Sequence, residues 1–169
     1  MNAHLLPKQN LRSCKGFSVL DLLIAAVLIL VVVSYAVSTM VHGQKPALRT
    51  SAAQQFVNYL QRARDDSMRR RATASPQMAQ VTILNDKYYC VRMDGNGDGA
   101  LDMPIVISIV EQPVTMNGPF PRTFMFDSVG KPVDSNAGVI EVSPITFTNS
   151  SGTSTIKISD NGRAVMEKP

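Results

Sequence analysis

Oxygen-bearing side chains recur at alternate positions in one glycine-rich stretch, and they form the strongest candidate metal site in the sequence. Asp94, Asn96 and Asp98 are separated by single glycines, and Asp102 follows four residues later. Oxygen ligands at positions 1, 3, 5 and 9, with glycine for a sharp turn, match the opening of a calcium-binding EF-hand loop. Position 12 is Ile105, where that loop has glutamate. The stretch therefore predicts either a short calcium loop or a solvated turn, which Gly, Asp and Asn favour without a metal.

Arginines are concentrated in a second stretch, where they could contact phosphates. They are Arg62, Arg64, Arg69, Arg70 and Arg71. At about 100° per residue, these side chains would scatter around a helix, and two aspartates at 65 and 66 interrupt them. A solvated helix surface or a subunit contact is the interpretation we prefer to a nucleic-acid stripe.

No set of residues has the spacing of a catalytic site. The two histidines are His4 and His42, and neither a Ser/His/Asp arrangement nor a phosphate-binding glycine loop occurs. We therefore expect no enzymatic activity and no cofactor other than the calcium ion considered above. Cys90 is expected to be a small buried strand residue, with an intermolecular disulfide as the alternative.

The longest apolar stretch lies near the N-terminus, at residues 22–40. These 19 residues would form a helix of about 28 Å, close to the thickness of a bilayer core. Residues 1–16, ahead of the stretch, carry three cations (Lys8, Arg12 and Lys15) and no acidic residue. This charge bias predicts a cytoplasmic N-terminus and an exported C-terminal part. Without those three cations, the formal net charge of +4 falls to about +1, so charge alone is no argument for nucleic-acid binding.

One acidic residue, Asp21, lies at the edge of this apolar stretch. A carboxylate costs about 2.5–3.5 kcal/mol if it is carried to the membrane centre, so Asp21 needs a cationic partner. Cleavage after Gly16 would create one, because it would free an α-amino group on Phe17 about one helical turn away. A signal anchor that is never cleaved is the alternative.

The rest of the chain predicts a helix followed only by strands. One buried helix face is predicted by residues that recur with helical spacing: Phe56, Leu60, Ala63 and Ser67. We expect a bend or a loosened turn before this face, near residues 43–46. We expect the helix to end near residue 74. Alternating apolar residues then predict strands at 81–84, 87–92, 105–110, 123–126, 145–148, 155–158 and 163–166. We expect an α+β protein: a long N-terminal transmembrane helix packed on an antiparallel β-sheet. Its parts are a leader (1–16), a membrane helix (17–43), an amphipathic helix (44–75) and a β domain (76–169).

The N-terminal motif also carries a resemblance to a known family. It reads Lys15-Gly16-Phe17-Ser18-Val19-Leu20-Asp21, and with the apolar helix that follows it resembles the class III signal of type IV pilins and type II secretion pseudopilins. Stretches 61–71, 126–130 and 156–163 are similar, in that order, to the GspH/FimT branch. The fold that this resemblance implies is pilin-like.

The resemblance implies a function and its partners. A prepilin peptidase would cut after Gly16 and methylate Phe17, and Asp21 would take the position of the family's usual glutamate. The chain would be a non-enzymatic minor subunit, single-pass in the inner membrane with a periplasmic C-terminal domain. It would then join other pilin or pseudopilin subunits in a type IV pilus or a type II secretion pseudopilus.

One subgroup of this branch binds DNA during natural transformation, through a Gly-Arg-x-Arg motif. The matching positions here are Gly162 and Arg163, with Val165 in place of the second arginine. A DNA-binding minor pilin that uses Arg163 is therefore the alternative function.

Overall fold

The computed structural model describes residues 18–134, 138 and 142–167. The predicted leader, and with it Gly16 and Phe17, lies outside these residues. The chain divides into two compact units, Met1–Met40 and Val41–Pro169. Helix α1 (Val19–Arg70) contributes to both units.

Hydrogen bonds define both ends of α1. At the start, the Ser18 hydroxyl accepts from the Leu20 N–H (3.3 Å), and the Asp21 carboxylate accepts from the Ser18 N–H (3.3 Å). This reciprocal pair is a capping box. At the end, Arg71 takes a left-handed φ of 52°, and the N–H groups of residues 71 and 72 bond back to the carbonyls of residues 68 and 67. That Schellman motif closes the helix at Arg70.

The structure corrects one expectation about this helix. It ends at Arg70 rather than near residue 74, because the left-handed Arg71 stops it before Pro76 can act. The helix also runs through Pro46, and the bend expected near residues 43–46 stays a prediction. A proline removes a single backbone N–H from a helix, so the turns on either side keep their own hydrogen bonds.

The strands form two antiparallel sheets rather than the single sheet expected. The first has the order β3-β2-β1-β5-β6, and the second has the order β4-β7-β8-β9. Their bounds are β1 (Gln80–Ile83), β2 (Tyr88–Arg92), β3 (Ile105–Ser108), β4 (Thr115–Asn117), β5 (Arg122–Phe126), β6 (Pro132–Val133), β7 (Ile145–Asn149), β8 (Gly152–Ile158) and β9 (Ala164–Glu167). A short 3-10 helix, η1 (Ser75–Gln77), precedes them. The sequence missed β4 and β6, which are too short to show a period of two.

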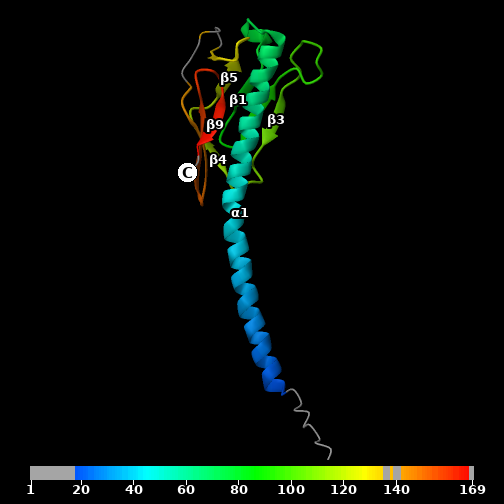
Figure 1. Ribbon diagram of the computed structural model, residues 1–169, viewed down its shortest axis with the longest axis vertical. Coiled ribbons are helices and arrows are strands. Elements are labelled where there is room, and N and C mark those ends of the chain that lie inside the picture. The colour runs from blue at the N-terminus through cyan, green and yellow to red at the C-terminus, as the bar shows by residue number, and fades with distance from the viewer. Residues whose placement is uncertain (1–17, 135–137, 139–141, 168–169) are drawn as a thin grey trace, which may run out of the picture. The chain divides into compact units, whose positions relative to one another are not determined.

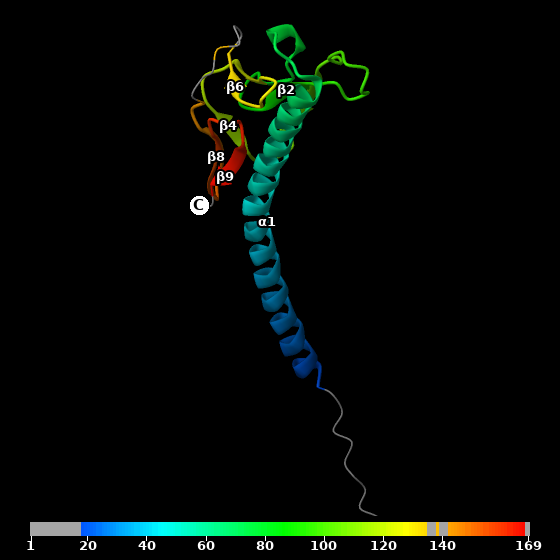
Figure 2. The ribbon, with the colours of Figure 1, turned by 45° about the horizontal axis from the view of Figure 1, so that its top comes forward.

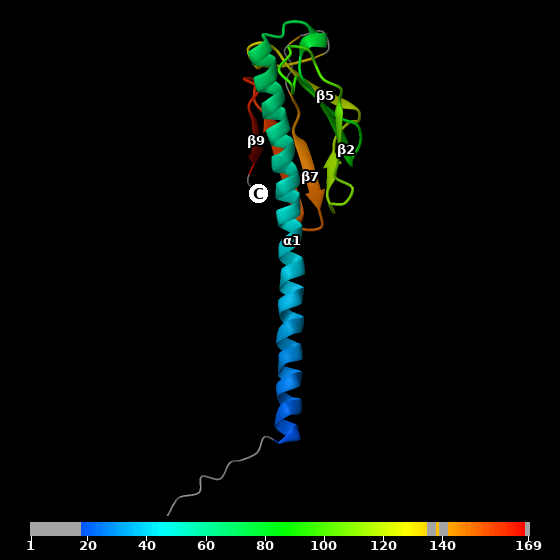
Figure 3. The ribbon, with the colours of Figure 1, turned by 90° about the vertical axis from the view of Figure 1, so that its right-hand side faces the viewer.

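In the second unit, both sheets pack on the C-terminal half of α1 (Figures 1, 2 and 3). The expected helix face is confirmed, because Phe56, Leu60 and Ala63 are fully buried. The Phe56 ring lies 5.1 Å from the Tyr89 ring of the first sheet and 5.6 Å from the Phe147 ring of the second. This phenylalanine therefore joins the helix to both sheets. The α+β class is borne out, with the helix and the two sheets sharing one core.

Candidate functional site

The N-terminal half of α1 is apolar on all sides and has no packing partner among the described residues. Every residue from 19 to 40 is exposed, including Leu28 and Tyr35. The segment is long and apolar enough to cross a membrane. A helix that is hydrophobic all round is stable only when lipid or other protein covers it. The first candidate site is therefore an apolar helix surface rather than a pocket.

Asp21 lies in the first turn of this surface and already has a local partner. Its carboxylate accepts the Ser18 N–H, as described above, and its charge complements the positive end of the helix dipole. Only one of its oxygens is used in this bond, so the other can still meet a cation. The structure thus places one of the three predicted N-terminal site residues, Asp21. The other two, Gly16 and Phe17, are outside the described range.

The four predicted calcium ligands lie together in the loop between β2 and β3. Asp94 accepts from the N–H groups of Gly97 (2.6 Å) and Gly99 (3.0 Å), and Asp102 accepts from the Gly95 N–H (2.7 Å). The other two predicted ligands are Asn96 and Asp98, and the Asn96 amide donates to the Asp98 carboxylate. Their side-chain oxygens also accept from the N–H groups of residues 98 and 100. Gly97 and Gly99 have φ of 84° and 90°, a conformation that glycine adopts without strain.

These contacts describe a turn that is closed by its own hydrogen bonds. Within the described residues, no three His, Cys, Asp or Glu side chains gather as a metal site would require. A calcium ion would have to compete for the loop's side-chain oxygens with the backbone N–H groups that now donate hydrogen bonds to them. Calcium binding by this loop stays a prediction from the sequence.

An ion-pair network fixes this loop to the end of α1. Arg69 Nη2 lies 3.0 Å from Asp66 and 3.2 Å from Asp94, and Arg70 donates to the other Asp66 oxygen at 2.6 Å. The side chains of Asp66, Asp94 and Arg70 are almost inaccessible, with 6%, 1% and 9% exposed. Two of the five arginines expected on a solvated surface are therefore structural partners of buried carboxylates.

The environment of Asp94 favours its ionised form. Burial by itself would raise the pKa of this carboxyl. The hydrogen bonds from the Gly99 and Gly97 N–H groups, and the charges of Arg69 and Arg70, outweigh burial and hold the pKa of Asp94 below its ordinary value. The loop is thus stabilised by a charged carboxylate.

Two turns of matching construction meet at a third arginine, Arg64. One turn joins β5 to β6 and the other joins β8 to β9, and each has a left-handed glycine in its fourth position, Gly130 (φ 83°) or Gly162 (φ 75°). Arg64 Nε donates to the carbonyl oxygens of Gly130 (3.1 Å) and Asn161 (3.2 Å). A Cβ at Gly162 would collide with the Gly130 carbonyl oxygen. Glycine is therefore required where the two turns touch.

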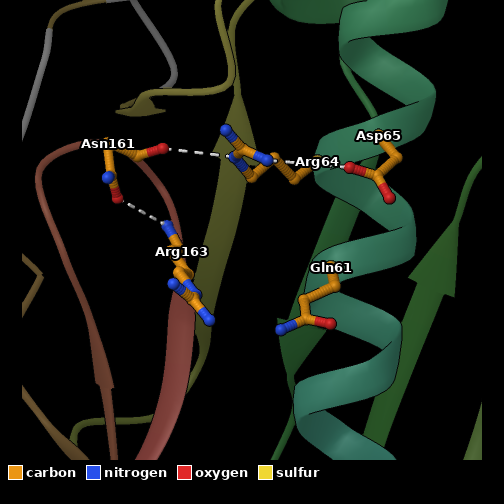
Figure 4. A pocket seen from close by; sticks show the side chains of 5 residues that line it. All are labelled: Gln61, Arg64, Asp65, Asn161 and Arg163. Atoms are coloured by element: carbon orange, nitrogen blue, oxygen red, sulfur yellow. Dashed lines mark hydrogen bonds and ion pairs between the residues drawn. The ribbon is translucent and has the colours of Figure 1, made fainter.

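A polar cleft of about 320 Å³ opens beside this contact (Figure 4). It is lined by Gln61, Arg64, Asp65, Asn161 and Arg163. The Arg64 side chain reaches from α1 toward the Asn161 turn, and the Arg163 side chain extends toward Gln61 of α1 (Figure 4). The sequence-predicted Arg163 is thus brought together with Arg64 from the basic stretch. The arrangement can hold an anion.

Sequence reasoning named Arg163 and Arg64 separately, and it did not place them in one cleft. The two turns share a local pattern, glycine followed by a cation, in Gly130-Lys131 and Gly162-Arg163. Nothing in the sequence showed that Arg64 would meet both turns. That contact depends on how two separate sheets pack on one helix.

Comparison with protein-family models, curated proteins and solved structures finds no match for this chain. The fold and the sites described above therefore carry the functional argument.

Proposed function

We propose that this protein is a non-enzymatic minor subunit of a type IV pilus or a type II secretion pseudopilus. The observation that carries the proposal is the exposed, predominantly apolar surface of residues 19–40 in α1, in which Asp21 is the one charged residue. The same helix continues into the core of an α+β domain. A subunit that waits in a membrane and then packs its helix among other helices needs both features.

Assembly would proceed from the membrane. The chain is inserted once in the inner membrane with its β domain in the periplasm, and the prepilin peptidase removes the leader after Gly16. The apolar helix surface then exchanges lipid for the helices of other subunits, a transfer between two apolar environments that costs little. Shape and polar contacts, rather than hydrophobicity, must then select the packing.

Asp21 would supply the polar contact in this packing. A carboxylate in an apolar bundle is stable only when it is paired. Its capping bond to the Ser18 N–H uses one oxygen, so the other can meet the ammonium group of Phe17 on a neighbouring subunit. Such a pair would set the axial position of one subunit against the next.

Intact-mass measurement and N-terminal sequencing, after co-expression with a prepilin peptidase, test this proposal. We expect a chain that begins at Phe17, with or without an added methyl group. A Gly16→Leu variant is the control, and it should keep the leader while inserting in the membrane equally well. A wild-type chain that retains residues 1–16 would reject the pilin proposal and leave a single-pass membrane protein.

A DNA-binding minor pilin is the second candidate function. The observation that favours it is the exposure of Arg163 beside Arg64 in the polar cleft. Binding of DNA by phosphate contacts should weaken steeply as the salt concentration rises. In a plot of log affinity against log salt concentration, an Arg163→Ala variant should reduce the steepness of the slope by about one.

A further inference from the structure

We propose that the polar cleft between α1 and the Gly162 turn binds a carboxylate side chain of a neighbouring subunit, held by Arg64 and Arg163. The identity of the partner as a subunit rests on the proposed function. The chemistry of the ligand rests on the cleft alone. Three features of the cleft support it: a fixed guanidinium, an unpaired one, and flanking acidic residues.

Arg64 is held in position before any ligand arrives. Its Nε donates to two backbone carbonyls from two different turns, and its side chain is 27% exposed. Those bonds leave the terminal nitrogens free for a ligand, apart from a contact of 3.7 Å between Nη1 and Asp65. A guanidinium fixed in this way loses little entropy when it binds a carboxylate, which it can contact through two parallel N–H groups.

Arg163 supplies the second charge. Its backbone N–H bonds to Asn161 Oδ1 at 3.1 Å, which fixes the turn, but its guanidinium has no hydrogen bond or ion pair within the described part of the chain. The Gln61 amide of α1 donates to the Ala164 carbonyl of β9 at 3.2 Å, so the helix and the strand that flank the cleft are joined directly. The cleft is therefore assembled, and its most exposed cation is unpaired.

The charges around the two arginines favour a single carboxylate over a nucleic acid. Asp65 lines the cleft, and the exposed Asp160 precedes Asn161 in the turn. Duplex DNA carries one charge per about 1.7 Å of its axis, so neighbouring phosphates would be repelled by these aspartates. One acidic side chain avoids this repulsion. A volume of about 320 Å³ also suits one side chain better than a stretch of duplex.

The test measures binding of two probes of equal charge to the full chain in detergent, by fluorescence anisotropy. The probes are a labelled oligoglutamate peptide and a labelled short DNA duplex. We expect the wild-type chain to bind the peptide in preference to the duplex. An Arg163→Glu variant should bind the peptide about tenfold more weakly or worse, because one charge-assisted contact becomes repulsive. An Arg92→Glu variant, which changes the net charge equally at an exposed position at the end of β2, should bind as the wild type does.

A covalent readout locates the ligand. In an Arg163→Lys variant, a carbodiimide should couple the new amine to a peptide carboxylate, and mass spectrometry should find the product at position 163. An Arg92→Lys variant should give no such product. Coupling at both positions, or peptide affinity that Arg163→Glu leaves unchanged, overturns the proposal. Tighter binding of the duplex, lost in Arg163→Glu, assigns the cleft to nucleic acid instead.

The two proposals can fail separately. A chain that is cleaved after Gly16 but binds no peptide would overturn the carboxylate site and leave the pilin function standing. A chain that binds the peptide through Arg163 but keeps its leader would retain the site and lose the filament partner.

Discussion

The two halves of α1 present opposite kinds of surface. In the C-terminal half, one stripe that includes Phe56 and Leu60 is fully buried, while positions such as Gln54 and Asn58 are exposed. In the N-terminal half, apolar residues cover the whole circumference, and all of them from 19 to 40 are exposed. The N-terminal half therefore has no packing partner among the residues that the structure describes, and the C-terminal half packs against the two sheets.

This contrast separates two roles within one helix. A stripe of about a third of the circumference is what a helix needs to pack against its own domain. An apolar surface all round satisfies a membrane, and it also permits packing against several other helices at once. The C-terminal half contributes its buried stripe to the core of the β domain. Membrane insertion and assembly are the roles that we propose for the N-terminal half.

The largest expected effect comes from removing the ring that joins the helix to both sheets. Phe56→Ala should lower the free energy of unfolding of the domain by about 3–5 kcal/mol, because it deletes a fully buried ring and leaves a cavity. Urea unfolding of the full chain in detergent measures this. Leu28→Ala is the matched control in the N-terminal half and should leave the domain's unfolding unchanged. An equal loss in both variants would show that the two halves do not differ as described.

A smaller effect is expected from acid, through the Asp94 loop. The pKa of Asp94 is lower in the folded protein than the value of about 3.9 for an unfolded chain, so its contribution to stability is present above that value. The contribution is lost as the pH falls through the folded pKa. Asp94→Asn should lower the melting temperature at neutral pH and flatten its decline in acid, as measured by circular dichroism.

Asp98→Asn is the control for this measurement, because Asp98 is exposed in the same loop and forms no ion pair among the described residues. Repeating both scans with excess calcium also tests the metal prediction. A rise in melting temperature that both substitutions reduce would support calcium ligation. If Asp94→Asn melts like the wild type at every pH, the ion-pair network does not hold the loop.

Much of the fold could be predicted from the sequence because its signals are local. The period of Phe56, Leu60 and Ala63 marks the buried helix face, and seven of the nine strands show alternation or β-branched residues within a few positions. The assignment of strands to two sheets could not be predicted, because pairings such as that of β1 with β5 join residues about 40 positions apart.

The candidate sites divide in the same way. The apolar segment with Asp21 and the loop around Asp94 are contiguous in sequence, so their residue types are visible together. The cleft joins Arg64 to Arg163, which are nearly 100 residues apart, and only packing brings them together. The capping box from Ser18 to Asp21 is likewise local, since a serine followed three residues later by an acid is its sequence pattern, and the sequence analysis did not predict it.

Photocrosslinking from the two halves of α1 tests the central claim most directly. A benzophenone amino acid replaces Tyr35, which is 76% exposed in the apolar segment, or Tyr59, which packs against the domain core. In cells that hold the assembly machinery, we predict crosslinks from position 35 to the apolar N-terminal helix of another subunit, and crosslinks from position 59 only within the chain. Lipid adducts alone at position 35, in a chain that has been cleaved, would contradict the account.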